Sequence, residues 1–207
     1  MNAVDVNTAV DVILIGILAA VWLAAGMLAD GMSAVGSARQ LRRRAGLLSA
    51  LVVAGVAVFA AVPIISGMVP GLSAAPTAAL LPAVPAFVVL TATIRRLGWV
   101  RRGSGAFATA PLTPVPPALR AAAAHPLLAA PLQVTGLAAL AGLPIAAGAV
   151  ALPGGQATAV AGIAVITTVL AVALIGIRAG LRHSRLAPLV LAPLDRDREK
   201  IPAGVVR

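Results

Sequence analysis

Long apolar stretches dominate the chain, and short segments rich in arginine, proline or glycine separate them. About 20 predominantly apolar residues suffice for an α-helix to cross the roughly 30 Å hydrocarbon core of a bilayer. Several stretches approach or exceed this length, and they predict five transmembrane helices, at residues 12–29, 46–69, 77–94, 127–152 and 157–177. The pattern therefore predicts an all-α fold, a polytopic membrane helix bundle over residues 1–185 with a tail over residues 186–207.

The distribution of basic residues orients these helices. They follow the first, third and fifth predicted spans: Arg39, Arg42, Arg43 and Arg44; Arg95, Arg96, Arg101, Arg102 and Arg120; and Arg178, Arg182, Arg185, Arg196, Arg198, Lys200 and Arg207. In a five-span protein all these segments lie on one side of the membrane, and lysine and arginine favour the cytoplasmic side. The sequence therefore predicts an N-terminus outside and a C-terminus in the cytoplasm. A sixth span would export the basic tail, so five spans are favoured.

Composition excludes several classes of protein. The 207 residues are 60% hydrophobic and 11% charged, with a mean hydropathy of +1.03, and a soluble domain of this size could not bury so much apolar surface. Topology accounts for the net charge of +10, so nucleic acid is not an expected partner. The absence of cysteine excludes disulfides and thiolate chemistry. An excess of alanine, glycine, proline and arginine is typical of GC-rich codons and predicts a protein of a bacterial inner membrane.

A signal peptide is the alternative interpretation of the first apolar stretch. Signal peptides carry a positively charged segment before their apolar core. Here the first 38 residues contain no lysine or arginine, and Asp5 and Asp11 precede the stretch. We therefore interpret it as an uncleaved membrane anchor.

Small residues recur at a four-residue spacing within two predicted spans, and such spacing lets membrane helices approach closely. These residues are Gly16, Ala20 and Ala24 in the first span, and Ala138, Gly142 and Ala146 in the fourth. Packing within the chain is the favoured interpretation, because alanine is abundant enough to produce the spacing by chance. A dedicated face for a partner subunit is the alternative.

Prolines occur inside three of the predicted spans: Pro63, Pro82, Pro85, Pro131 and Pro144. Each removes a backbone hydrogen bond and predicts a kink, and the freed carbonyl group needs another donor. Broken helices also line the sites of transporters. We interpret the prolines as packing features rather than as a transport pathway.

Candidate chemistry is sparse. Asp11 and Asp30 are expected at the two membrane interfaces rather than buried, and His125 and His183 fall short of a metal site. Gln133 is expected to hydrogen-bond across helices, as is Thr135, although a ligand contact is the alternative for both. The segment 103–105, Gly-Ser-Gly, is expected to be a flexible turn. The sequence predicts no enzyme, no metal and no cofactor.

The loop before the fourth predicted span has a helix of its own. Pro116 and Pro117 are placed to start a short cytoplasmic helix over residues 118–124, and Pro126 ends or kinks it. Leu119, Arg120 and His125 are its candidate contact residues. Residues 110–128 resemble the coupling region of exporter permeases of the ABC-2 type, where a Leu-Pro or Ala-Pro step precedes a basic helix rich in leucine and alanine. Those permeases have six spans, whereas this chain predicts five.

The resemblance implies a cytoplasmic ATPase that would engage this helix. We therefore predict a multi-pass membrane protein without a catalytic site of its own, acting as a permease-like component of a transport system. The alternative is a structural or accessory subunit of a larger membrane complex. The expected partners are the lipid bilayer and other membrane subunits.

Overall fold

The computed structural model describes residues 3–69, 72–110 and 112–149, together with Ile175, Arg178 and Leu181. The elements named over these residues are all helical. They are α1 (Ala3–Asp30), η1 (Gly31–Ala34), α2 (Ala38–Met68), α3 (Ala75–Val88), η2 (Val89–Thr93), α4 (Ile94–Gly105), α5 (Pro117–Ala123), α6 (Pro126–Ala141) and α7 (Leu143–Ala146). The element η1 is a 3₁₀-helix and η2 a π-helix. An all-α fold is therefore confirmed for the described residues.

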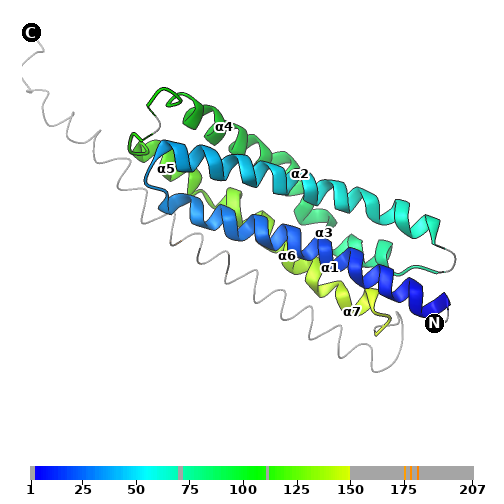
Figure 1. Cartoon of the computed structure of the whole chain (residues 1–207). Helices are drawn as coiled ribbons and strands as arrows, with labels where there is room; N and C mark the ends of the chain where they lie inside the picture. Colours follow the sequence, from blue (N-terminus) through cyan, green and yellow to red (C-terminus); the bar gives the residue numbers. More distant parts are fainter. Residues whose placement is uncertain are drawn as a thin grey trace, which may run out of the picture.

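The long helices run antiparallel along one axis (Figure 1). Four helical segments are long and apolar enough to cross a membrane: Val6–Ala34, Ala38–Met68, Ala75–Gly105 and Pro117–Ala146. They overlap the first four predicted spans, but the bounds differ: the segment that matches the predicted span 127–152 begins at Pro117, and its described helix ends at Ala146. The starts of α2 and α5 and the end of α4 gather at one end of the bundle, and the N-terminus and α7 lie at the other (Figure 1).

The helices extend beyond the apolar stretches that identify them. The predicted second span begins at Gly46, whereas α2 begins at Ala38, so that the segment 39–44 with its four arginines is helical. The predicted third span ends at Ile94, whereas η2 and α4 continue it without interruption to Gly105. Hydropathy marks the part of a helix that suits hydrocarbon, while arginine is itself a good helix former. The segments predicted as loops before the second span and after the third are therefore partly helical.

The fifth predicted span, 157–177, and the tail, 186–207, lie outside the described residues except for Ile175. This residue, Arg178 and Leu181 are helical. A fifth span and the orientation of the chain stay predictions.

Helix α1 forms the centre of the bundle and packs against α2 and α6. Its buried face carries Ile15, Leu18 and Trp22, whose side chains are fully buried. Glycines allow the closest approaches: a Cβ atom built on Gly55 of α2 would lie 2.8 Å from the indole of Trp22. One built on Gly136 of α6 would lie 2.8 Å from the backbone nitrogen of Leu23. The contact between α1 and α6 therefore depends on glycine.

The predicted stripe of small residues on α1 lies outside this core. Gly16 has no atom within 4 Å of a built Cβ, and Ala20 and Ala24 are exposed. In the fourth span, by contrast, Ala138 and Ala146 are buried, and a Cβ on Gly142 would lie 3.0 Å from the carbonyl oxygen of Ala78. The two stripes thus lie in different environments, and the use of either by a partner stays a prediction.

One proline-freed carbonyl group has a clear new donor. Pro131 has no N–H, so the carbonyl oxygen of Leu127 lacks its usual helical partner. The hydroxyl of Thr93, in the π-helix η2, donates a hydrogen bond of 2.8 Å to that oxygen, and the Thr93 side chain is fully buried. Proline in α6 and the π-turn in the third span are therefore complementary, since one frees an acceptor and the other positions a donor.

This complementarity predicts coupling between the two residues. Thr93→Val should destabilise the bundle by about 1 kcal/mol, because the Leu127 carbonyl loses the hydroxyl donor that replaces the missing N–H of Pro131. In a Pro131→Ala background the alanine N–H can serve that carbonyl, so Thr93→Val should cost clearly less. A double-mutant cycle of unfolding in mild detergent measures the difference. Equal costs in the two backgrounds would contradict the assignment.

Candidate functional site

Nine arginines lie in the first turns of α2, along α4 and on α5, toward one end of the bundle, and we call this region the basic end. It comprises Arg39, Arg42, Arg43, Arg44, Arg95, Arg96, Arg101, Arg102 and Arg120. The guanidinium of Arg44 donates a hydrogen bond of 2.8 Å to the carbonyl of Gly31, and that of Arg101 donates one of 3.3 Å to the hydroxyl of Ser49. Most of these side chains are exposed. The opposite end, within the described residues, carries no arginine.

At the basic end, the segment before α2 pairs with the segment before α5. Ser37 and Pro114 form an antiparallel bridge, in which the N–H of Ala38 donates to the carbonyl of Thr113 and the N–H of Val115 donates to that of Gly36. Val115 is buried. The bridge fixes the segment before α5 against the start of α2, so the basic end has a defined shape.

The short helix α5 packs against α4 at the basic end through one buried side chain. Leu119 is buried and fills the space where a side chain at Gly103 would lie, on the last turn of α4. Arg120 is half-buried, whereas Pro117 and Ala118 are exposed. The expected helix is therefore present, at Pro117–Ala123, and it presents Pro117 and Ala118 outwards.

The Gly-Ser-Gly segment at 103–105 is not a turn, and that prediction is wrong. It forms the end of α4, where Ser104 is buried and its hydroxyl donates to the carbonyl of Arg101. Gly103 is needed because Leu119 occupies its side-chain space. The signal in the sequence is ambiguous, since glycine ends helices, marks turns and permits close contacts alike.

His125 acts as a helix cap. It is the N-cap of α6, and its Nδ1 accepts a hydrogen bond of 3.2 Å from the N–H of Leu127. Its position is therefore set by the start of α6 rather than by α5. Contact of His125 with a partner stays a prediction.

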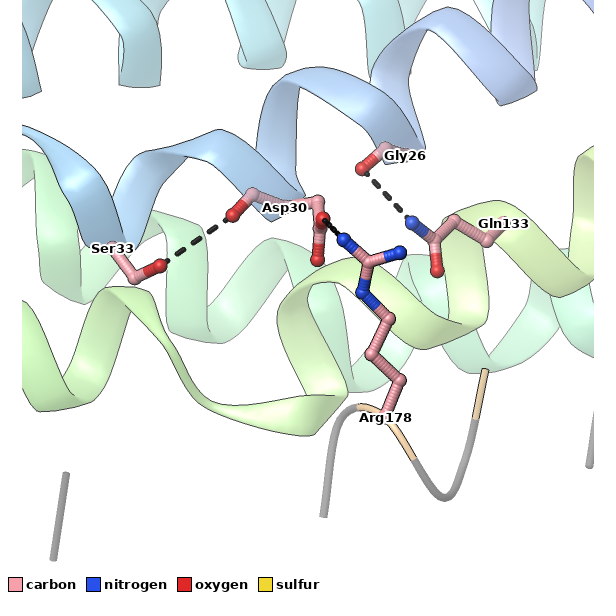
Figure 2. A network of polar contacts seen from close by, with 5 residues as sticks. All are labelled: Gly26, Asp30, Ser33, Gln133 and Arg178. Carbon is pink, nitrogen blue, oxygen red and sulfur yellow. Dashed lines mark hydrogen bonds and ion pairs between the residues drawn. The ribbon is translucent and has the colours of Figure 1, made fainter. Parts of the chain in front are cut away.

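A polar network joins α1, α6 and Arg178 near the basic end (Figure 2). The carboxylate of Asp30 pairs with Arg178 at 3.5 Å, and the amide of Gln133 donates to the carbonyl of Gly26 at 3.5 Å. Gln133 therefore hydrogen-bonds across helices, as expected, and it also lines a cavity of about 290 Å³ beside Arg178. Thr135 instead donates to Pro131 in its own helix, so the expectation of a bond to another helix is wrong for Thr135.

Asp11 differs from its expected environment, because its side chain is only 3% exposed. Its two carboxylate oxygens accept hydrogen bonds of 2.7 Å, one from the hydroxyl of Ser73 and one from the N–H of Ala74. These groups precede α3, whose N-terminus carries partial positive charge. Asp11 of α1 thus caps a neighbouring helix, and no sequence spacing could reveal a cap supplied from 62 residues away.

A cavity of about 210 Å³ opens at the basic end. It is lined by Ala38, Arg39 and Arg42 of α2, Ser104 of α4, and the following Phe107 and Ala108. We call it the arginine cavity. A second cavity of about the same volume is lined by Trp22, Phe59 and Phe87, among others, and its lining is almost wholly apolar.

Metal chemistry receives no support from the described residues, among which no group of three His, Cys, Asp or Glu side chains could hold an ion. Comparison with protein-family models, curated proteins and solved structures finds no significant match to the chain.

Proposed function

We propose that this chain is a multi-pass membrane protein without a catalytic site of its own, and that it joins a larger membrane assembly through its basic end. The observation that carries the proposal is the construction of that end. Nine arginines, a bridge between two connecting segments and the anchored helix α5 occur together there. A surface held in shape by such contacts is suited to binding a partner.

The polar groups inside the bundle support the same conclusion. Asp11 caps α3, Thr93 serves the Leu127 carbonyl, and Gln133 bonds to Gly26. Each of these groups holds one helix to another. Their use in packing favours a structural subunit over a protein that conducts protons or performs chemistry.

Site-specific crosslinking tests this proposal. A photo-crosslinking residue at Ala118, exposed on α5, should capture a discrete partner in cells. The matched control is the same residue at Leu72, which is exposed at the opposite end. Capture from Ala118 but not from Leu72 is expected. Purification as a lone monomer, with no adduct from Ala118, would overturn the proposal.

A permease-like role is the second candidate, and the attachment of α5 favours it. Leu119 packs at Gly103 on α4, and α4 continues through η2 into α3, which contacts α6. A force applied to α5 would therefore reach two membrane-length segments. This is the mechanical property that a coupling helix for a cytoplasmic ATPase requires.

Charge changes on α5 distinguish this role from simple assembly. If α5 couples to an ATPase, Arg120→Glu or Ala118→Glu should lower the ATPase activity of the captured partner about tenfold without dissociating it. Arg43→Glu makes the same charge change as Arg120→Glu, at an exposed site on α2 away from α5, and should leave the activity unchanged. Full activity in both α5 variants would exclude the coupling role.

A further inference from the structure

We infer that the arginine cavity binds the phosphate of an anionic phospholipid headgroup. The inference rests on the proposed membrane location, and it adds a ligand class to the basic end. Arg39 and Arg42 are three residues apart, so both lie on the same face of α2. They line one wall of the cavity, and Phe107 and Ala108 line the facing segment.

The cavity has a defined shape because its two walls are fastened together. The N–H of Ala38 donates to the carbonyl of Thr113, and the N–H groups of Phe107 and Ala110 donate within the segment that leads there. Ser104, which also lines the cavity, is buried. The two arginines therefore line a hollow rather than a flat surface.

Within the part of the chain that the structure describes, no ion pair compensates the arginines that line the cavity. The first turn of α2 contains no acidic residue, although a helix N-terminus favours acidic residues. Four exposed arginines occupy positions 39 to 44 instead, and their charge opposes the helix dipole. Among the described residues, the carboxylate nearest this end is Asp30, and it pairs with Arg178. A bound anion would supply the missing negative charge.

The expected position of the cavity in the headgroup layer favours a lipid as the source of that anion. Helix α2 has 31 residues, which corresponds to about 46 Å at 1.5 Å per residue, whereas the hydrocarbon core spans about 30 Å. Its arginine-bearing first turns therefore reach the headgroup layer. Guanidinium groups bind phosphate oxygens in a bidentate manner, and basic pockets between helices bind anionic headgroups. The apolar Phe107 and Ala108 suit the glycerol and acyl part of a lipid, which free phosphate lacks.

The test uses the full-length protein reconstituted in phosphatidylcholine nanodiscs and titrated with phosphatidylglycerol, with bound lipids counted by native mass spectrometry. The wild type should retain one phosphatidylglycerol in preference to phosphatidylcholine. The double variant Arg39→Gln with Arg42→Gln should weaken this binding about tenfold or more, since each arginine near the surface contributes attraction to anionic lipid. Glutamine is a good helix former, and removal of positive charge from this terminus does not oppose folding.

The matched control is Arg43→Gln with Arg95→Gln, which removes the same charge from exposed sites that do not line the cavity. It should retain the bound lipid. Equal loss in the two double variants would show diffuse attraction and overturn the inference, as would displacement of the lipid by millimolar inorganic phosphate. Failure of the wild type to enter phosphatidylcholine nanodiscs would instead contradict the membrane location, which separates the two proposals.

Discussion

Replacing Gly136 with alanine is expected to destabilise the bundle by about 2–3 kcal/mol, although the change adds a single methyl group. The new Cβ would lie 2.8 Å from the backbone nitrogen of Leu23 and 2.7 Å from its Cγ. A backbone atom inside a helix cannot move aside alone, so α1 and α6 must separate along their contact. Unfolding of the purified protein in mild detergent, followed by circular dichroism, measures the loss.

Gly16→Ala is the matched control, since it makes the same substitution on α1 at a position where nothing lies within 4 Å. It should leave stability unchanged or raise it by up to about 1 kcal/mol, because alanine favours helix over glycine. The two variants also compare the observed contact at Gly136 with the small-residue stripe predicted on α1, to which Gly16 belongs. A loss at Gly16 as large as the loss at Gly136 would show that Gly16 lies in a packed interface.

Asp11→Ala should destabilise the protein by about 2–3 kcal/mol, because it removes a charged acceptor from two donors. The hydroxyl of Ser73 and the N–H of Ala74 would both lose their partner, and the start of α3 would lose its negative charge. The loss should appear in the free energy of unfolding, measured as for Gly136.

Asp30→Ala serves as the control for the removal of a carboxylate. Asp30 pairs with Arg178, whose side chain is 73% exposed, and such pairs contribute about 0–1 kcal/mol. A cost at Asp30 equal to that at Asp11 would contradict the view that burial and capping make the difference. An Asp11→Ala protein of unchanged stability would show that α3 starts without this cap.

The observed start of α2 differs from the predicted one, although a motif in the sequence marks it. The start of α2 at Ala38 could have been found from Ser37, whose hydroxyl accepts a hydrogen bond from the N–H of Gln40. A serine followed three residues later by glutamine is a capping signature. The hydropathy criterion overlooked it because arginines follow, and hydropathy reports immersion in hydrocarbon rather than helix formation.

Other contacts had no signal along the chain. Leu119 fills the space at Gly103, Thr93 serves the carbonyl that Pro131 frees, and Asp11 caps α3. The sequence indicated that a freed carbonyl would need a donor, but many hydroxyl groups were available. The choice depends on which helices are neighbours and on their register, and neither is encoded in local spacing.

By itself, the sequence determined the all-α fold class: the lengths of its apolar stretches predicted helices that the structure confirms for the described residues, because hydropathy is a sum over neighbouring residues. The sequence also predicted that the arginines lie toward one end, because antiparallel helices of similar length place alternate connections at the same end. Only the tertiary structure decided which glycines are contact points, which carboxylate is buried and which arginines line a cavity. These depend on atoms from distant segments meeting within a few ångströms, and a side chain's own neighbours in the chain do not specify them.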